Sequence, residues 1–158
     1  MTTEILLVED EPSIALLMSR VLAAAGYGVT HAATGAAALQ AARTVDHDLI
    51  VLDLILPDMR GERVLAEVMV IWPGSRVLVV SSVTDAATRA AVLRQGALDF
   101  LAKPFANAEL LARVRAWIRD DRREPGPPMP PIRCVRGNGR LGIVEQGEVV
   151  ADGRASSW

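Results

Sequence analysis

Hydrophobic positions along the first 120 residues follow two alternating periods. Short apolar runs predict buried strands, and apolar stripes spaced three and four residues apart predict amphipathic helices. The predicted strands cover residues 4–8, 28–32, 49–53, 76–81 and 98–102. The helical stripes cover residues 14–22, 34–43, 64–71, 85–96 and 110–118. Apolar strands that alternate with helices indicate an α/β domain whose parallel sheet is covered on both faces.

Polar residues and glycines mark where several of these helices begin and end. Asp10 and Glu11 precede Pro12, which predicts an acidic cap with proline in the first turn of the first helix. Thr34 and Asp85 are expected to cap the second and fourth helices. The connections are therefore short, and right-handed crossovers leave few possible topologies.

The character of the chain changes after residue 120. Residues 121–131 contain five prolines, which predicts a linker biased towards extended conformations. In the tail, residues 132–158, two short alternating runs at 141–144 and 148–151 predict a possible β-hairpin. We therefore expect a domain over residues 1–120, a Pro-rich linker over 121–131 and a short tail over 132–158.

Charge and cysteine content exclude several classes of protein. The 158 residues carry 17 basic and 19 acidic side chains, so a net charge of -2 gives no electrostatic case for binding nucleic acid or a membrane surface. The single cysteine, Cys134, allows no intrachain disulfide and, without a signal-peptide pattern, predicts a cytoplasmic location. The longest stretch without charged residues, 21–42, is broken by glycines and polar residues, so no membrane span is expected.

The basic residues are almost all arginine. Lys103 is the only lysine among the 17. A lysine ammonium is a compact point charge on a flexible stem, which the planar guanidinium of arginine does not reproduce. Lys103 is therefore either what remains after a coding bias towards arginine, or a residue whose site requires an ammonium.

Polar residues follow four of the predicted strands at their carboxyl ends. Glu9 and Asp10 follow the first strand, Asp53 ends the third, Ser81 ends the fourth and Lys103 follows the fifth. These ends meet at one edge of a parallel sheet, where ligands bind in such folds. Clustered carboxylates repel unless a cation joins them, and their oxygens suit Mg²⁺. The pattern predicts a Mg²⁺-assisted phosphoryl site with Asp53 as the nucleophile.

Each of these residues also has a purely structural interpretation. Asp10 could cap the first helix, and Ser81 and Ser82 could be turn residues. All four strand ends carry a group that a phosphoryl site needs, and this combination favours the functional interpretation.

Four segments together resemble the receiver domain of bacterial two-component response regulators. The spacings are 43 residues from Asp10 to Asp53, 28 from there to Ser81 and 22 from there to Lys103. The resemblance covers residues 1 to about 120 and implies a flavodoxin-like (βα)5 fold with a sheet of order 2-1-3-4-5. The segments are Leu7–Pro12, Leu52–Gly61, Val79–Ser82 and Gly96–Phe105.

The resemblance implies a role for each residue of the predicted site. Asp53 would accept a phosphoryl group from a sensor histidine kinase or a histidine phosphotransfer protein. Glu9, Asp10, Asp53 and the backbone carbonyl of Ile55 would place Mg²⁺, and the Lys103 ammonium would pair with phosphoryl oxygens. Such a protein is not an enzyme acting on an external substrate, and only autophosphorylation and slow autodephosphorylation are expected.

The resemblance also implies a switch. Ser81 would hydrogen-bond the phosphoryl group, and Phe100 would be the aromatic residue that turns inward with it, although plain core packing also explains a phenylalanine. The peptide bond between Lys103 and Pro104 is cis in this family.

Four charged residues suggest how the switch is used. Arg89, Asp99, Glu109 and Arg113 fall where winged-helix (OmpR/PhoB-type) regulators carry charges that bridge a receiver homodimer. Arg89 would face Glu109 of the second copy, and Asp99 would face Arg113. The alternative is an ordinary solvated helix face, and exposed pairs contribute only about 0–1 kcal/mol each.

The tail resembles the opening strands of a winged-helix effector. Its 27 residues contain no basic helix for a major groove, so no specific DNA binding by this chain is expected. A stand-alone receiver, acting as a phosphorelay intermediate or by protein contact, is the alternative. A flavin-binding protein is disfavoured because the acidic residues 9–11 would repel phosphate. A haloacid-type phosphatase is disfavoured because neither Asp10 nor Asp53 has a second aspartate two residues on.

Overall fold

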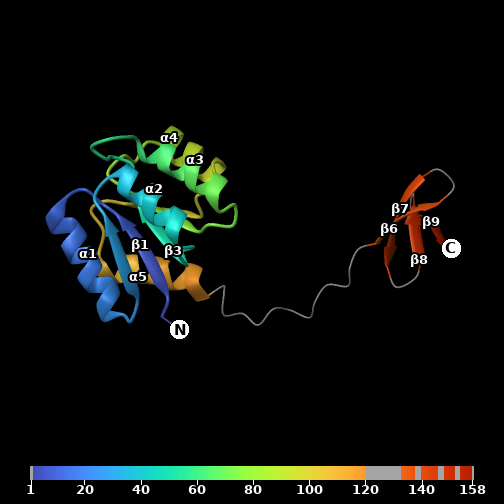
Figure 1. Ribbon diagram of the computed structural model, residues 1–158, viewed down its shortest axis with the longest axis horizontal. Coiled ribbons are helices and arrows are strands. Elements are labelled where there is room, and N and C mark those ends of the chain that lie inside the picture. The colour runs from blue at the N-terminus through green and yellow to red at the C-terminus, as the bar shows by residue number, and fades with distance from the viewer. Residues whose placement is uncertain (1, 120–132, 138–139, 146–147, 152–153, 158) are drawn as a thin grey trace. The chain divides into compact units, whose positions relative to one another are not determined.

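The computed structural model describes residues 2–119, 133–137, 140–145, 148–151 and 154–157 (Figure 1). The chain divides into two compact units, residues 1–122 and 123–158. The Pro-rich segment expected at 121–131 lies outside the described residues.

The first unit alternates strands and helices as the hydrophobic pattern predicts. Its five strands are all parallel and lie in the order β2-β1-β3-β4-β5, which confirms the expected flavodoxin-like topology. The strands are β1 Glu4–Val8, β2 Gly28–Ala32, β3 Leu49–Leu52, β4 Val77–Ser81 and β5 Asp99–Ala102. The helices are α1 Pro12–Ala24, α2 Gly35–Thr44, α3 Gly61–Ile71, α4 Ala86–Arg94 and α5 Asn107–Arg119.

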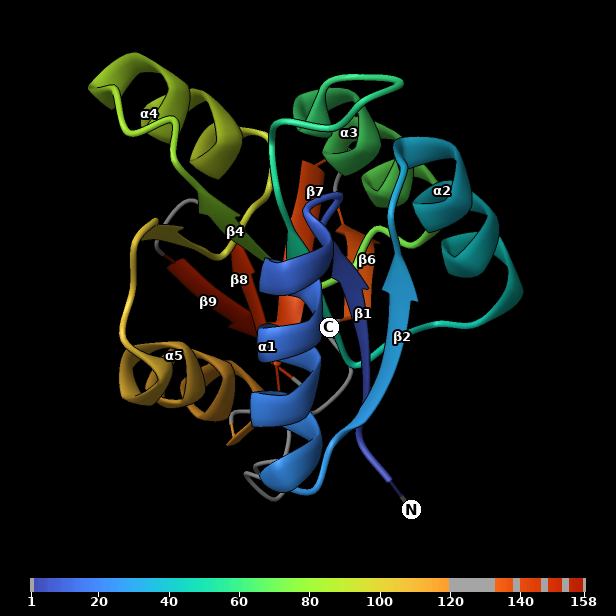
Figure 2. The same cartoon turned by 90° about the vertical axis from the view of Figure 1, so that its left-hand side faces the viewer.

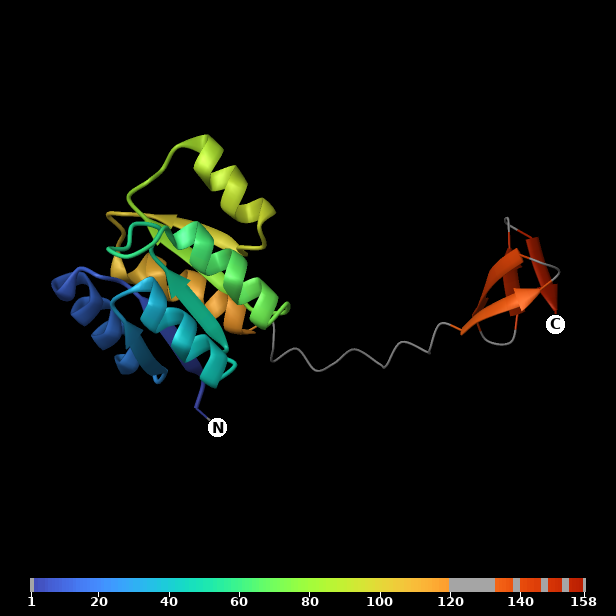
Figure 3. The ribbon, with the colours of Figure 1, turned by 45° about the horizontal axis from the view of Figure 1, so that its top comes forward.

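The core consists of two apolar layers, one on each face of the sheet. Successive side chains of a strand point to opposite faces, so Leu6 and Val8 of β1 pack with α2, α3 and α4, while Ile5 and Leu7 pack with α1 and α5. Figure 2 shows α1 beside α5, and Figure 3 shows α2 beside α3. The sheet is therefore buried on both faces, which leaves its carboxyl edge as the place where polar groups can gather.

The cap of α1 differs from one alternative that the sequence left open. Glu11, and not Asp10, is the N-cap residue, and its carboxylate accepts hydrogen bonds from the amides of Ser13 and Ile14 at 3.4 and 2.9 Å. Thr34 and Asp85 cap α2 and α4 as predicted. Because Glu11 supplies the cap, the carboxylate of Asp10 is left for other contacts.

One position of the predicted α1 stripe does not enter the core. Leu17 is 48% exposed, although the stripe suggested burial, while Ala15, Met18 and Leu22 are buried. Each helical residue turns the side-chain direction by about 100°. Leu17 therefore points away from the sheet on the side of α1 that faces the carboxyl edge.

Asp99, at the start of β5, joins that strand to α5. Both of its carboxylate oxygens accept hydrogen bonds from Arg113 Nη1 at 2.7 Å, and Trp117 Nε1 donates to Oδ2 at 3.4 Å. Partial burial opposes ionisation of Asp99, but the Arg113 guanidinium together with hydrogen bonds from the Phe100 amide and Trp117 outweighs it, and the pKa of the carboxyl is lowered from its ordinary value near 3.8.

The second unit is a four-stranded antiparallel sheet in the order β6-β7-β8-β9. Its strands are β6 Arg133–Gly137, β7 Arg140–Glu145, β8 Glu148–Ala151 and β9 Arg154–Ser157. The middle strands contain the two alternating runs seen in the sequence. The outer strands lack such a pattern, and β6 pairs with β7 while β9 pairs with β8.

Within the described residues, no helix is both long and apolar enough to cross a membrane. The uncharged stretch 21–42 is divided among α1, β2 and α2.

We expect Gly61→Ala to lower the free energy of unfolding by about 1–3 kcal/mol, a usual cost of overpacking. A Cβ atom at Gly61 would lie 2.5 Å from the backbone oxygen of Asp53 and 2.5 Å from the Cα of Leu54, so backbone must move. Urea denaturation measures the loss. Gly74→Ala is the control, because a Cβ there meets no atom within 4 Å. Equal losses in both variants would contradict the close packing of α3 against β3.

We expect Asp99→Asn to destabilise the protein more at pH 7 than at pH 3. A carboxyl with a lowered folded-state pKa stabilises the fold above its unfolded pKa, and this contribution is lost as the pH falls through the folded pKa. Denaturation at the two pH values measures the difference, with exposed Asp46→Asn as the control. A penalty independent of pH would show that Asp99 acts without its charge.

Candidate functional site

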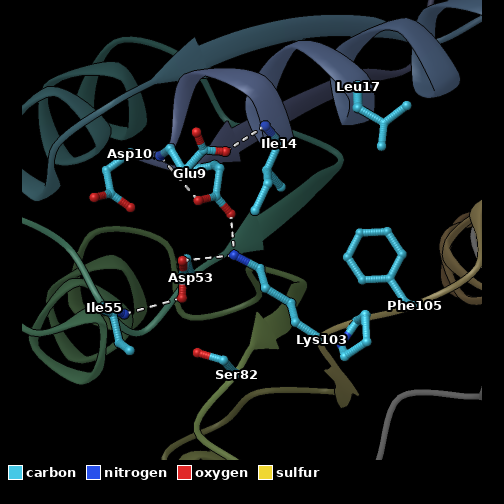
Figure 4. Close-up of a pocket in the computed structure, with 11 residues that line it drawn as sticks. Glu9, Asp10, Ile14, Leu17, Asp53, Ile55, Ser82, Lys103 and Phe105 are labelled. Atoms are coloured by element: carbon cyan, nitrogen blue, oxygen red, sulfur yellow. Dashed lines mark hydrogen bonds and ion pairs between the residues drawn. The ribbon is translucent and has the colours of Figure 1, made fainter.

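Three charged side chains meet at the carboxyl edge of the sheet. Glu9 follows β1 and is 2% exposed, Asp53 follows β3 and is also buried, and Lys103 follows β5. The Lys103 Nζ atom donates to Glu9 Oε2 at 2.5 Å and to Asp53 Oδ2 at 2.9 Å. Figure 4 shows the ammonium between the two carboxylates. Residues up to 94 positions apart in the chain thus form one cluster, because β1, β3 and β5 all end at this edge of the sheet.

Asp10 completes an acidic group beside this contact. One carboxylate oxygen from each of Glu9, Asp10 and Asp53 lies within 4.8 Å of the others. Three carboxylates face one ammonium, so the cluster carries excess negative charge. Hard oxygen ligands in such an arrangement fit Mg²⁺, which binds a few protein oxygens and keeps water or phosphate oxygens as its other ligands.

Burial and hydrogen bonding set the protonation of the site in opposite directions. Burial raises the pKa of Glu9 from its ordinary value of 4.5, and the contact with Lys103 only partly offsets it. Burial also disfavours the charged form of Lys103, but its hydrogen bonds to Glu9 and Asp53 prevail and raise its pKa. Lys103 therefore stays an ammonium. This single positive charge does not fully offset the cost of burying the ionised Glu9 carboxylate.

The loop after Asp53 brings Ile55 to the same edge. The Ile55 amide donates to Asp53 Oδ1 at 3.1 Å, and Ile55 forms an isolated bridge with Arg60. Three residues further on, the carboxylate of Asp58 accepts hydrogen bonds from the amides of Gly35 and Ala36 at the start of α2. Nothing in the sequence marks Asp58 for this contact, because an aspartate after a proline indicates no more than a loop.

A pocket of about 570 Å³ opens over the charged cluster. One side is charged, and the other carries apolar side chains of Ile14, Leu17 and Phe105 (Figure 4). These three were not expected at the site, since Ile14 and Leu17 fit the helical stripe and Phe105, the last residue of the segment Gly96–Phe105, was given no role. The pocket is lined by Glu9, Asp10, Glu11, Ile14, Leu17, Asp53, Ile55, Ser82, Lys103, Pro104 and Phe105.

The two serines at the end of β4 differ in position. Ser81 is fully buried, and its hydroxyl accepts a hydrogen bond from the Val83 amide at 3.2 Å. Ser82, in contrast, lines the pocket. The Ser81 hydroxyl would have to turn towards the pocket to reach a group bound at Asp53, which is the movement that the resemblance implies.

Phe100 is buried in the apolar layer beneath α2, α3 and α4. The guanidinium carbon of Arg89 lies 4.9 Å from the centre of its ring, which is a cation–π contact. The bond between Lys103 and Pro104 is cis, as expected. Phe100 thus connects the core to the charged face of α4 and α5.

The charges expected to bridge a dimer make contacts inside one chain. Arg113 pairs with Asp99 at 2.7 Å, and its Nη2 lies 3.8 Å from Glu109 Oε1. Arg89 stacks on Phe100. A symmetric dimer that used the predicted pairs would therefore exchange these contacts for equivalent ones between copies.

Sequence comparison places the first unit in a known family. Residues 5–115 match the family model of the response regulator receiver domain. The transcriptional regulatory protein KdpE of Mycobacterium tuberculosis (strain CDC 1551 / Oshkosh) is 42% identical over 117 residues, which are 74% of this chain and 51% of KdpE. The chain thus spans about half the length of the curated relatives it matches, which are regulators of the winged-helix class.

Solved structures share the fold. A CheY-like receiver domain protein from Methanospirillum hungatei JF-1 superimposes with a TM-score of 0.76 at 26% identity, over 79% of this chain and 100% of that chain. The receiver domain of the sensor histidine kinase PA1611 from Pseudomonas aeruginosa PAO1 has a magnesium ion coordinated in its active-site cleft. It gives a TM-score of 0.70 at 31% identity, over 75% of this chain and 99% of that chain. With its parallel five-stranded sheet and its acidic carboxyl edge, this chain belongs to the response regulator receiver domain family.

Proposed function

We propose that this protein is a two-component response regulator that accepts a phosphoryl group on Asp53. The donor is the phosphohistidine of a sensor histidine kinase or of a histidine phosphotransfer protein. The observation that carries the proposal is the buried Asp53 carboxylate in an open pocket, with the Lys103 ammonium 2.9 Å from one oxygen and two further carboxylates beside it.

The chemistry needs one nucleophile and compensation of negative charge. A carboxylate oxygen of Asp53 attacks the phosphorus, the phosphorus–nitrogen bond breaks, and the imidazole leaves with the electron pair. Mg²⁺ held by Glu9, Asp10, Asp53 and the Ile55 carbonyl would neutralise charge on the phosphoryl oxygens. Lys103 would exchange its contact with Asp53 for one with the phosphoryl group. The magnesium ion in the related Pseudomonas receiver domain supports this assignment.

The apolar side of the pocket supports a protein donor. Leu16 and Leu17 on α1 are about half exposed, and Leu17 lines the pocket together with Ile14 and Phe105. Exposed apolar side chains beside a charged site favour contact with another protein. A small anionic donor uses only the charged side.

The output follows from the added charge. A phosphoryl group brings about -1.5 to -2 charges, and its pull on Lys103 and Ser81 would shift the face formed by α4, β5 and α5 towards a homodimer. We propose a role in transcription regulation because the relatives are transcriptional regulatory proteins. They do not favour the alternative of a stand-alone relay protein. We also propose that the protein acts in the cytoplasm and has no external substrate. We propose no specific DNA binding by this chain alone.

We expect the protein incubated with Mg²⁺ and acetyl phosphate to gain one phosphoryl group, and Asp53→Asn to gain none, because the amide is not a nucleophile. Intact-mass spectrometry measures the labelling. Exposed Asp46→Asn is the matched control and should be labelled like the unsubstituted protein. Equal labelling of the Asp53→Asn variant would refute the assignment of the acceptor.

We expect Arg89→Glu to weaken the phosphorylated homodimer about tenfold or more, since two symmetric pairs of up to about 1 kcal/mol each become repulsive. Sedimentation velocity with acetyl phosphate and Mg²⁺ measures dimerisation. The double variant Arg89→Glu/Glu109→Arg should restore the dimer by reversing the pair. Arg115→Glu, an exposed charge reversal on α5, should leave it unchanged. Failure of the double variant to restore dimerisation would reject the pairing.

A further inference from the structure

The loop from Asp53 to Gly61 carries two groups of the proposed Mg²⁺ site, the Asp53 carboxylate and the Ile55 carbonyl. The start of this loop is bonded to the sheet, and its last residue is bonded back to Leu54 near that start. The Asp53 amide donates to the Val8 carbonyl at 3.0 Å, and the Gly61 amide donates to the Leu54 carbonyl at 2.9 Å. The Ile55 side chain is 53% exposed, so its own packing does little to fix the residue.

The tip of the loop is fixed by Asp58. Its Oδ1 accepts a hydrogen bond from the Gly35 amide at 2.8 Å, and its Oδ2 accepts one from the Ala36 amide at 2.9 Å. These are free donors in the first turn of α2, where the helix dipole favours a carboxylate. The two amides lower the pKa of Asp58, so the carboxylate is ionised at neutral pH.

The contact between the loop tip and α2 is also close in packing. A Cβ atom at Gly35 would lie 2.3 Å from Met59 Cγ and 2.6 Å from its sulfur, so the absence of a side chain at Gly35 makes room for Met59. Leu56 and Met59 pack against the apolar layer on this face of the sheet. The loop therefore rests on α2 through one charged contact and one apolar contact.

We propose that Asp58 is a positioning residue for Mg²⁺, which holds the loop against α2 so that Ile55, whose carbonyl belongs to the proposed site, keeps its contact with the Asp53 carboxylate. This inference rests on the proposed function. Mg²⁺ demands near-ideal octahedral geometry with short bonds, so a small displacement of one ligand lowers its affinity. Asp58 touches neither the metal nor the phosphoryl group and acts only through the loop.

A purely structural role for Asp58, as a second cap of α2, makes a different prediction. Thr34 provides the comparison, because its hydroxyl accepts a hydrogen bond from the Ala37 amide in the same turn of α2 without touching the loop. Thr34→Ala and Asp58→Ala each remove an acceptor from the start of α2. Only Asp58→Ala releases the loop tip.

The test is an NMR titration of the full chain with MgCl₂, which follows the amide signals of Asp53 and Ile55. We expect Asp58→Ala to weaken Mg²⁺ binding about threefold to tenfold, less than the loss on removing a direct partner of a metal ligand. Asp58→Asn keeps one acceptor oxygen and should give an intermediate affinity. Thr34→Ala should bind Mg²⁺ like the unsubstituted protein, while urea denaturation without Mg²⁺ shows a comparable loss of stability in Thr34→Ala and Asp58→Ala.

Two results would overturn the inference, and they differ in what else they overturn. Equal Mg²⁺ affinity in the unsubstituted, Asp58→Ala and Asp58→Asn proteins would reject the positioning role and leave the proposed function intact. No Mg²⁺ binding by the unsubstituted protein would overturn the positioning role and the proposed function together.

Discussion

The ammonium of Lys103 between the carboxylates of Glu9 and Asp53 is the contact on which the site depends. Burying two carboxylates beside a third is unfavourable unless positive charge compensates them. One lysine supplies part of that charge, as the raised pKa of Glu9 shows. The remaining imbalance suits a divalent cation, and an incoming phosphoryl group would find an ammonium already in place. A guanidinium offers a wider planar fork instead of a point charge, so a site that needs a compact charge would keep its lysine in a chain otherwise biased towards arginine.

The sheet supplies the rigidity that this charge arrangement requires. Two apolar layers hold β1, β3 and β5 from both faces, so the residues that follow these strands are fixed relative to one another. The loop between β3 and α3 lies outside these layers at its exposed residue Ile55. Its contact with the start of α2 through Asp58 connects the site to an element outside it. On the opposite side, Phe100 and Arg89 connect the core to the charged face of α4 and α5.

Much of the fold could be predicted because its signals are local. Apolar runs and stripes give the strands and helices of the first unit, and Thr34 and Asp85 cap the helices that they were expected to cap. The apolar stripe of α1 wrongly predicted burial of Leu17 in the core. Periodicity shows which side chains share a helix face but not which neighbour that face contacts. In the second unit only β7 and β8 had a sequence signal, and β6 and β9 are recognised only from their backbone pairing with these two strands.

For the site, the sequence by itself determined which chemical groups lie at the strand ends, since the carboxyl ends of parallel strands share one edge whatever the details of packing. Only the tertiary structure decided how these groups divide their contacts. In the structure Glu11 caps α1, and Asp10 belongs to the acidic group. Ser81 is buried, whereas Ser82 lines the pocket. Asp99 pairs with Arg113 within one chain. The tertiary structure also brought Asp58 to the start of α2. Hydrogen bonds and ion pairs act over a few ångströms between residues far apart in sequence, so no local pattern records them.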